Sequence, residues 1–248
     1  MAQLRLATKA DLADLMRLST AVGWNQVEAD WLRLLELEPE GCFGIEDDGR
    51  VAASATVITY GRELAWIGMV LTLPDCRGRG FATRLMERCL DYCDGRQVRT
   101  VKLDATDLGR PVYEKFGFVE EAAVERWKGT LAGAQRREFE HDYELDRMAF
   151  GADRRALVER LGFSRAGRVA SYAGPVVART VEEARARIMY GGAVGATFWD
   201  LPVVNAAAVA LAGELGFVAV RRLWRMRRGP AIEERPDLVY ALGGFEYG

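Results

Sequence analysis

The sequence predicts an α/β fold with a mixed sheet (α+β), built as two tandem copies of one pattern, of which the second is degenerate. Helical and strand periodicities alternate along the chain, as they do in folds where helices cover a sheet. Half of the 248 residues are hydrophobic, which is enough for a sizeable core. A helix end at Phe116-Gly117-Phe118 recurs as Leu215-Gly216-Phe217, and this recurrence indicates an internal duplication.

Local signals justify the elements of the first half in turn. Thr8, followed three residues later by Asp11, is typical of a helix start. Asp48-Gly49 between two apolar runs is typical of a hairpin turn, and Gly95 and Gly117 each stop a helix. The predicted strands are 3–6, 42–46, 51–60, 64–73, 98–104 and 118–127. The predicted helices are 9–20, 27–37, 79–94 and 109–116.

The second half repeats this order more weakly. The polar segment Lys128–Glu140 is predicted to be a linker. Beyond it, the predicted strand 196–200 mirrors the stretch 101–104 of the first half. The other predicted elements are helices 152–161, 180–190 and 205–215, a strand that ends at 174–178, and a strand at 218–228. These patterns predict two domains, 1–130 and 141–248.

Charge and composition exclude several classes of function. The chain has a net charge of −2 and a pI of about 5.7, so a general nucleic-acid-binding surface is not expected. Apolar runs fall short of the roughly 18 residues that a membrane span needs, and Met1–Arg5 lacks the basic and apolar blocks of a signal peptide. We therefore expect a cytoplasmic protein without a membrane partner. The sequence leaves open whether it is a monomer or a homodimer.

Histidine and cysteine usage narrows the chemistry further. The chain has one histidine, His141, so histidine-based catalytic relays and zinc sites are not expected. The four cysteines are predicted to be reduced thiols. Cys89 and Cys93 recur at helical spacing with Leu85, which places them on the buried face of helix 79–94. The chemistry is expected to proceed without a metal.

The segment that carries chemistry joins a predicted strand to helix 79–94. Its glycines, Gly78 and Gly80, let backbone N–H groups approach a ligand closely. The N-terminus of the helix adds partial positive charge. With Arg77 and Arg79 at the rim, the segment predicts a cradle for a pyrophosphate.

Two other interpretations of this segment stay open. The first is an ordinary glycine-containing turn. The second is a dinucleotide-binding fingerprint, because Gly78-x-Gly80-x-x-Thr83 is similar to G-x-G-x-x-G and Asp104 ends the next strand. The missing third glycine disfavours this second interpretation, as does the position of the motif after several strands.

Two blocks, Arg77-x-x-Gly80-x-Ala82 and Pro111–Phe118, carry a family resemblance. The first is similar to the R/Q-x-x-G-x-G/A signature, and the second to the L-Y-x-x-x-G-F block, of the GNAT superfamily of acyl-coenzyme A-dependent N-acyltransferases. Within the superfamily, the chain resembles bacterial two-domain members, whose second half is a diverged copy of the fold. The segments similar to those members are Gly23–Asn25, Leu103–Thr106, Gly174–Ala178 and Tyr240–Gly248.

The resemblance implies acetyl-CoA as co-substrate and a role for each matched residue. The pantetheine arm would bind to the backbone of Val70, Leu71 and Thr72. The pyrophosphate would be held by Arg77, Gly78, Arg79, Gly80, Phe81, Ala82 and Thr83. Tyr113 would protonate the departing thiolate, since a phenol with a pKa near 10 stays protonated at neutral pH. Many relatives have Asn and Ala before this tyrosine, where this chain has Thr106 and Gly109 as candidate coenzyme contacts.

The acceptor side is less well marked in the sequence. Trp24, Asn25 and Trp66 are the candidate acceptor-binding residues, because an aromatic ring beside an amide in a loop suits recognition. Core packing is the alternative for the two tryptophans. No general base is identified, and Glu28 and Asp104 are the candidates.

Together, these patterns predict an N-acetyltransferase that moves the acetyl group of acetyl-CoA directly to an amine of a small molecule or peptide. Direct transfer is expected because no cysteine occupies a recognisable nucleophile position. The second half lacks the cradle and has Ala212 where a tyrosine would recur, so it is expected to bind no coenzyme. The alternative is a non-catalytic acyl-CoA-binding module. The arginine-rich stretch Arg221–Arg228 is either a solvated strand face or a means of steering an acidic acceptor.

Overall fold

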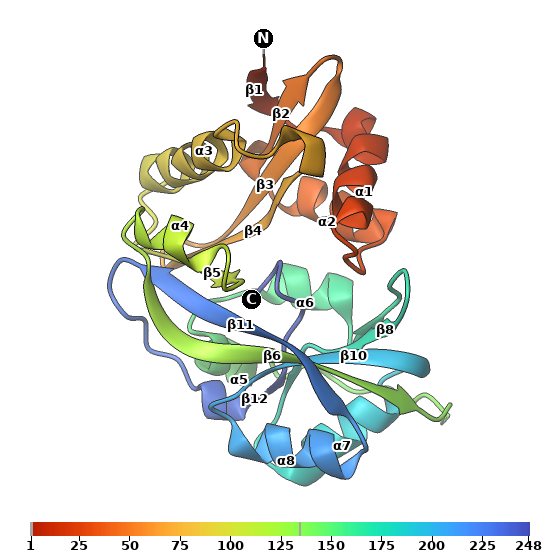
Figure 1. Cartoon of the computed structure of the whole chain (residues 1–248). Coiled ribbons are helices and arrows are strands. Elements are labelled where there is room, and N and C mark those ends of the chain that lie inside the picture. Colours follow the sequence, from red (N-terminus) through yellow and green to blue (C-terminus); the bar gives the residue numbers. More distant parts are fainter. Residues whose placement is uncertain (1, 134) are drawn as a thin grey trace. The chain divides into compact units, whose positions relative to one another are not determined.

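The computed structural model describes residues 2–133 and 135–248. Two compact units make up the described chain, the first ending at Val101 and the second covering Lys102–Gly248 (Figure 1). Each unit has its own strands with helices packed on them, which confirms the predicted combination of helices and a sheet.

The first unit is an antiparallel sheet flanked by helices. Its strands are β1 (Gln3–Leu6), β2 (Cys42–Asp47), β3 (Arg50–Tyr60) and β4 (Leu64–Thr72). Its helices are α1 (Leu12–Ala21), α2 (Glu28–Leu37) and α3 (Phe81–Gly95), with short 3-10 helices at Lys9–Asp11, Pro39–Gly41 and Pro74–Cys76. The strands pair in chain order, so each is reached from its neighbour by a local connection or by the α1–α2 pair.

Helices cover both faces of this sheet, with α3 on one face of β2–β4 and α1 and α2 on the other (Figure 1). Apolar residues at helical spacing produce the packing, because Leu85, Met86 and Cys89 of α3 are all fully buried. The predicted helix start is confirmed as well. The N–H of Thr8 donates to the Asp11 carboxylate at 2.8 Å, which completes a capping box.

All four cysteines are free and buried, which includes the predicted burial of Cys89 and Cys93. Burial raises the pKa of the Cys42 thiol to about 12 and also raises that of Cys89 well above its ordinary value. Because the thiolate is the reactive form, we expect a thiol reagent at mildly alkaline pH to label the folded protein slower than the unfolded one by roughly two orders of magnitude. Fast labelling of any cysteine in the folded state would contradict this prediction.

The second unit contains a longer sheet and a small two-stranded one. The long sheet consists of β5 (Thr100–Ala105), β6 (Val119–Leu131), β7 (Ser164–Arg165), β8 (Ser171–Ala173), β10 (Gly195–Pro202) and β11 (Val218–Arg228). The small sheet pairs β9 (Val176–Val177) with β12 (Val239–Ala241), which follows a 3-10 helix at Pro236–Leu238. The helices are α4 (Arg110–Glu114), α5 (Tyr143–Phe150), α6 (Arg155–Leu161), α7 (Val181–Tyr190) and α8 (Ala206–Glu214).

The strand order in the long sheet of this unit is β5-β11-β6-β10-β8-β7. β10 runs parallel to β8 and antiparallel to β6, so the sheet is mixed, as predicted. On one face, Trp127 and Trp199 pack against α7 and α8. On the other face, Val124 and Leu223 pack with Ala149 of α5. The alternation of side chains along β6 and β10 therefore separates two cores.

Strand β6 corrects the predicted linker at Lys128–Glu140. The strand continues to Leu131, and Lys128 pairs with Phe198 of β10 and with Val218 of β11. Polar residues are compatible with a strand whose alternate side chains face solvent. The polar composition of this segment was therefore wrongly taken as the sign of a linker. Helix α5 was not predicted either. Asp142 caps it by accepting the N–H of Leu145 at 2.9 Å.

The division after Val101 differs from the predicted bounds of 1–130 and 141–248. The reason is that β6 pairs along its length with β10 and β11, which come from the second half of the chain. Such pairing between distant segments leaves no local signal in the sequence. That the second half is a diverged copy of the first remains a prediction.

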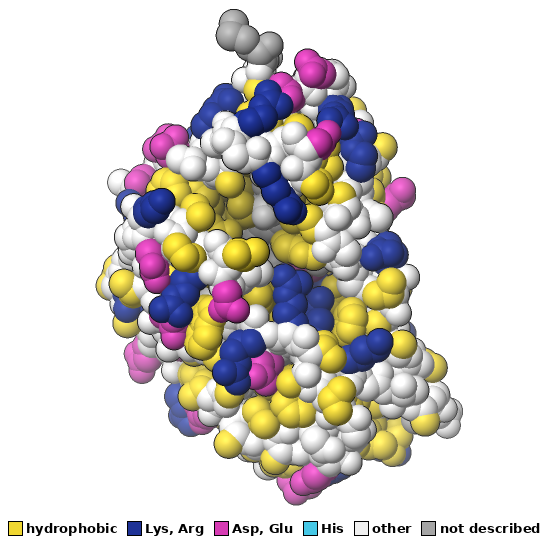
Figure 2. All heavy atoms as spheres, viewed as in Figure 1, with side chains coloured by type: hydrophobic (Ala, Val, Ile, Leu, Met, Phe, Trp, Pro, Cys, Tyr) yellow, Lys and Arg dark blue, Asp and Glu magenta, His cyan; other side chains and the backbone are white. Residues whose placement is uncertain are grey.

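The surface shows acidic and basic side chains interspersed over the face in view (Figure 2), in keeping with the small net charge of −2. Within the described residues, no helix combines the length and the apolar character needed to cross a bilayer. The expected lack of a nucleic-acid-binding surface remains a prediction.

Candidate active site

Strand β4 contains a bulge beside the residues predicted to bind pantetheine. The pairing of β3 with β4 shifts register between Ser54 and Thr56. At the shift, Met69 has a left-handed backbone with φ of 50°, and its carbonyl accepts a hydrogen bond from Ser54 Oγ at 2.9 Å. Bulges re-aim the main chain and are common beside active sites. This local geometry suits the predicted main-chain role of Val70–Thr72.

The predicted phosphate cradle is an open, glycine-containing turn that leads into α3. Gly78 and Gly80 have φ angles of 74° and 75°, a region that residues with a Cβ rarely adopt. A Cβ added at either glycine would meet no atom within 4 Å, so the backbone there is accessible to a ligand. No side chain caps α3, whose first turn begins at Phe81. Its N–H groups therefore suit an anion such as a phosphate.

The two arginines of the cradle differ in their surroundings. The Arg79 guanidinium donates to Asp47 at 2.5 and 3.1 Å and lies 4.6 Å from the centre of the Phe81 ring. This contact holds the pKa of Asp47 below its ordinary value. Arg77 is exposed and has no ion-pair partner among the described residues. Asp47 thus orients Arg79, while Arg77 extends into solvent.

The second predicted block lies in the second unit, where α4 carries the half-buried Tyr113. The turn before it is closed by the N–H of Gly109, which donates to Thr106 Oγ1 at 3.1 Å. The Tyr113 ring packs edge-on against Phe118, with ring centres 6.2 Å apart. A Cβ at position 109 would lie 3.0 Å from Tyr113 Cε2. Gly109 in place of alanine therefore leaves room for this ring.

The candidate acceptor-binding residues lie in the first unit and differ in exposure. Trp24 is half-buried in the loop between α1 and α2, and the adjacent Asn25 is 1% exposed. Trp66 is also 1% exposed and pairs with Ile58 across β3 and β4. Complete burial of Trp66 favours core packing for this residue. An acceptor role for Trp24 and Asn25 remains a prediction.

The two candidate general bases are in contrasting environments. Asp104 accepts two hydrogen bonds from Arg225, at 2.9 and 3.0 Å, and its side chain is fully buried. Burial raises the pKa of Asp104, and Arg225 lowers it by less. Glu28 is exposed at the first position of α2. A carboxylate bound on both oxygens by one guanidinium is poorly placed to accept a substrate proton, so the structure disfavours Asp104 as the base.

Two features of the first unit were missed at the sequence level. The bulge at Met69 follows Gly68, and a glycine inside a strand is a known sign of a bulge. The contact between Asp47 and Arg79 had no such sign, because it joins a hairpin turn to a loop 32 residues away. Only the folded chain brings those two residues together.

Helix α8 of the second unit corresponds in the predicted duplication to the helix of Tyr113. Asn205 Oδ1 accepts the N–H of Ala208 at 3.0 Å, and Asn205 Nδ2 donates to the carbonyls of Asp237 and Val239 at 2.9 Å each. Ala212 is fully buried. Asn205 thus caps α8 and ties it to β12. The expected lack of coenzyme binding by the second half remains a prediction.

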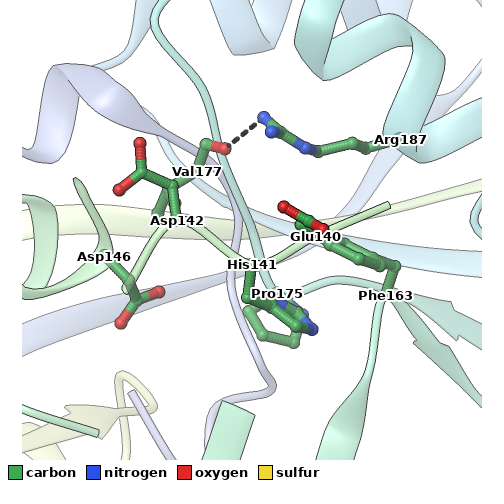
Figure 3. Close-up of a pocket in the computed structure, with 8 residues that line it drawn as sticks. All are labelled: Glu140, His141, Asp142, Asp146, Phe163, Pro175, Val177 and Arg187. Carbon is green, nitrogen blue, oxygen red and sulfur yellow. Dashed lines mark hydrogen bonds between the residues drawn. The ribbon is translucent and has the colours of Figure 1, made fainter. Parts of the chain in front are cut away.

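His141 lines a small pocket of the second unit (Figure 3). Its ring stacks on Phe163, with ring centres 4.1 Å apart, and burial lowers its pKa. The pocket volume of about 10 Å³ corresponds to about one water molecule. Among the described residues, no three His, Cys, Asp or Glu side chains are arranged to hold a metal ion. The expected independence from metals remains a prediction.

The predicted cradle, the bulged strand and the tyrosine block all lie between Met69 and Phe118. Residues 10–118 match the Acetyltransferase (GNAT) family. This region belongs to the GNAT acetyltransferase family. The match extends from α1 to Phe118 and so includes both blocks that predicted it. It also favours the acyl-CoA cradle over the dinucleotide fingerprint, because GNAT enzymes use acyl-CoA.

Two curated relatives resemble the GNAT region and its surroundings. Holothin acyltransferase of Pseudoalteromonas sp. (strain SANK 73390) is 33% identical over 107 residues, which cover 43% of this chain and 35% of that protein. The uncharacterized N-acetyltransferase YitH of Bacillus subtilis (strain 168) is 26% identical over 163 residues, which cover 60% of this chain and 56% of YitH. The matched part of this chain therefore spans between about a third and just over half of these relatives.

One solved structure resembles the chain over its whole length. It is the crystal structure of "A Putative Acetyltransferase" from Pyrococcus horikoshii, with 26% identity and a TM-score of 0.85. The likeness covers 100% of this chain and 96% of that one. The similarity to this structure thus continues beyond residue 118 into the part of the chain that the family match does not reach.

Proposed function

We propose that this GNAT protein transfers the acetyl group of acetyl-CoA directly to an amine of a small molecule or peptide. The observation that carries the proposal is the cradle, in which Gly78 and Gly80 leave an accessible backbone at the uncapped start of α3. Such a turn suits a pyrophosphate, and the family match extends across it.

Each part of the coenzyme has a candidate partner on this chain. The N–H groups at the start of α3 and the exposed Arg77 would hold the pyrophosphate, while Asp47 keeps Arg79 beside the ring of Phe81. The main chain at Val70–Thr72, after the Met69 bulge, would bind the pantetheine arm. Bound acetyl-CoA would supply an acetyl group already activated as a thioester.

Tyr113 would donate the proton that the departing sulfur needs. A phenol is protonated at neutral pH and can act as a general acid. Packing against Phe118 and Gly109 limits the positions of its ring, which keeps the direction of the hydroxyl reproducible. Direct transfer is supported by the four cysteines, since all four are buried and a buried structural thiol is inert as a nucleophile.

The proposal is tested by incubating the full chain with acetyl-CoA and a panel of small amines and peptides, with release of free coenzyme A as the readout. We expect release that depends on an amine, together with an acetylated product detected by mass spectrometry. Tight binding of acetyl-CoA without release for any amine or peptide would favour the non-catalytic binding module instead.

The second half is proposed to be a degenerate GNAT copy, so the full chain should bind one coenzyme A. The R-x-x-G-x-G/A pattern stands before α3, whereas the stretch Gly174–Thr180 that corresponds to it before α7 lacks this pattern. Calorimetric titration of the full chain with coenzyme A should give a stoichiometry of about one. Two equivalent sites per chain would overturn the asymmetric assignment.

A further inference from the structure

An irregular segment of the second unit lies between β6 and α5. It consists of residues 135–142, which form neither a helix nor a strand, and we call it the strap. Three alternate residues of the strap, Arg137, Phe139 and His141, contact aromatic side chains elsewhere in the unit. A segment without a backbone ladder of its own is held by such contacts, so its local stability depends on a few side chains.

Arg137 and Phe139 make two of these contacts. The N–H of Arg137 donates to the carbonyl of Tyr190, the last residue of α7, at 3.0 Å, and the Arg137 guanidinium lies 4.0 Å from the centre of the Tyr190 ring. Phe139 packs edge-on against Phe163, with ring centres 5.8 Å apart. Because Phe163 in turn packs on the core around Trp199, these contacts fasten the strap to the body of the unit.

His141 makes the third contact, and its ring can gain a charge. It stacks flat on Phe163, with ring centres 4.1 Å apart and planes inclined by 12°, and its centre lies 5.9 Å from that of the Tyr143 ring. The half-buried ring also lines the pocket of about 10 Å³, together with Pro175 and Val177 (Figure 3). Space for about one water molecule hydrates an imidazolium poorly, so the geometry favours the neutral ring.

The charged side chains around His141 do not offset this burial. They come from the strap, α5, α6 and α7; the acidic ones are Glu140, Asp142, Asp146 and Glu159, and the basic ones are Arg154 and Arg187. Asp146 is already bound on both oxygens by Arg154, at 2.8 and 3.0 Å, and Asp142 is paired with Arg179 at 2.7 Å. Burial therefore lowers the pKa of His141 below its ordinary value of 6.5, although the nearby carboxylates act in the opposite direction.

The direction of the pH effect follows from this shift. If the strap leaves Phe163, His141 enters water and titrates near pH 6.5. A group whose pKa is lower in the seated state favours seating fully above its ordinary pKa, and that preference weakens as the pH falls from 6.5 toward the lowered pKa. The chain has one histidine, and histidine is the side chain whose ordinary pKa places its change of charge between about pH 5 and 8.

We infer that the strap is a pH-sensitive switch, which is seated on Phe163 while His141 is neutral and is released when His141 takes up a proton from water. Release uncovers the Phe163 ring and separates the strap from the end of α7. All of the residues involved belong to the second unit, so the switch does not depend on the proposed acetyltransferase function.

Hydrogen exchange of the Arg137 amide, followed by NMR on the full chain, measures the release. Its protection factor, corrected for the intrinsic rate at each pH, should be constant from about pH 8 to 7. Below about pH 6.5 it should fall, by at most about tenfold per pH unit because one proton is taken up. The amide of Val203, which donates to the carbonyl of Ala123 at 3.0 Å in the same unit, is the reference and should keep its protection. Unchanged protection of Arg137, or an equal fall at Val203, overturns the inference.

Two variants assign the pH dependence to His141. His141→Phe keeps an aromatic ring on Phe163 without a proton to gain, so the protection of its Arg137 amide should be the same at every pH. A pH dependence like that of the wild type in this variant overturns the inference. Phe139→Leu is the matched control, since it weakens a contact that carries no charge and should lower the protection while keeping the pH dependence.

The wild type also gives the sign of the effect without any substitution. Because the chain has one histidine, the C2–H resonance of His141 is assigned without ambiguity, and its chemical shift reports the protonation of the ring. In the folded full chain, we expect its titration midpoint to lie below 6.5. A midpoint at or above 6.5 overturns the inference, because protonation would then favour the seated strap.

Discussion

Tyr113→Phe should lower the rate of acetyl transfer by about 10² to 10⁴, the usual contribution of general acid catalysis. Phenylalanine keeps the edge-on contact with Phe118 and fits over Gly109, so the fold and the affinity for coenzyme A should barely change. The proton donor for the departing sulfur is lost. The decrease corresponds to about 3–5 kcal/mol of activation free energy. The measurement is kcat, together with the single-turnover rate in case product release limits kcat.

The matched control for this prediction is Tyr143→Phe. Tyr143 is a tyrosine of the same unit whose hydroxyl donates to Glu159 at 3.3 Å on the surface, and losing that contact should leave the rate of acetyl transfer unchanged. A single-turnover rate of Tyr113→Phe equal to that of the wild type would remove Tyr113 as the acid. A water molecule would then be the proton donor to consider.

Gly80→Glu should abolish measurable binding of coenzyme A. The backbone at position 80 has a φ of 75°, which a residue with a Cβ adopts only at a cost of about 1–2 kcal/mol. The new carboxylate would also stand at the start of α3, where the proposed site holds phosphates of the same charge. Calorimetric titration with coenzyme A is the direct measurement, with circular dichroism to establish that the variant is folded.

Two further variants separate strain from charge at this position. Gly80→Ala introduces the strain without the charge and should weaken binding less than Gly80→Glu. Gly216→Glu introduces the same residue at a φ of 77° after α8, where a Cβ would likewise meet no atom within 4 Å. It lies outside residues 10–118 and should leave binding intact. Unchanged affinity in folded Gly80→Glu would mean that the cradle is not the phosphate site.

Much of the local structure was predicted correctly from neighbouring residues. The capping box at Thr8 and Asp11 and the hairpin at Asp48-Gly49 formed where the sequence placed them, and the helix predicted at 79–94 formed as α3, which starts two residues later. Each depends on the conformational preferences and hydrogen bonds of a few consecutive residues. The glycine-containing turn at Gly78 and Gly80 belongs to the same class, because it is encoded within one short stretch, and its role as a phosphate site remains a prediction.

The sequence-based predictions were wrong or incomplete where contacts between residues far apart in the sequence determine the structure. Lys128–Leu131 was taken into a linker, although these residues are strand because β10 and β11 pair with them. Trp66 was a candidate for the acceptor pocket, but its burial in the first unit favours the core. Asp104 was a candidate base until Arg225, distant in sequence, was seen to bind both of its oxygens.

The sequence by itself therefore determined the types of the local elements and the two motifs that indicate the family. Each of these features depends on residues that lie close together along the chain. The division of strands between the two units and the grouping of side chains from separate strands depended on the tertiary structure. Tyr172, Arg126 and Arg221 come from three strands, and only the register of those strands brings a buried hydroxyl beside opposed guanidinium groups. Hydrogen bonding between strands sets that register, and no local stretch of sequence records which strands will pair.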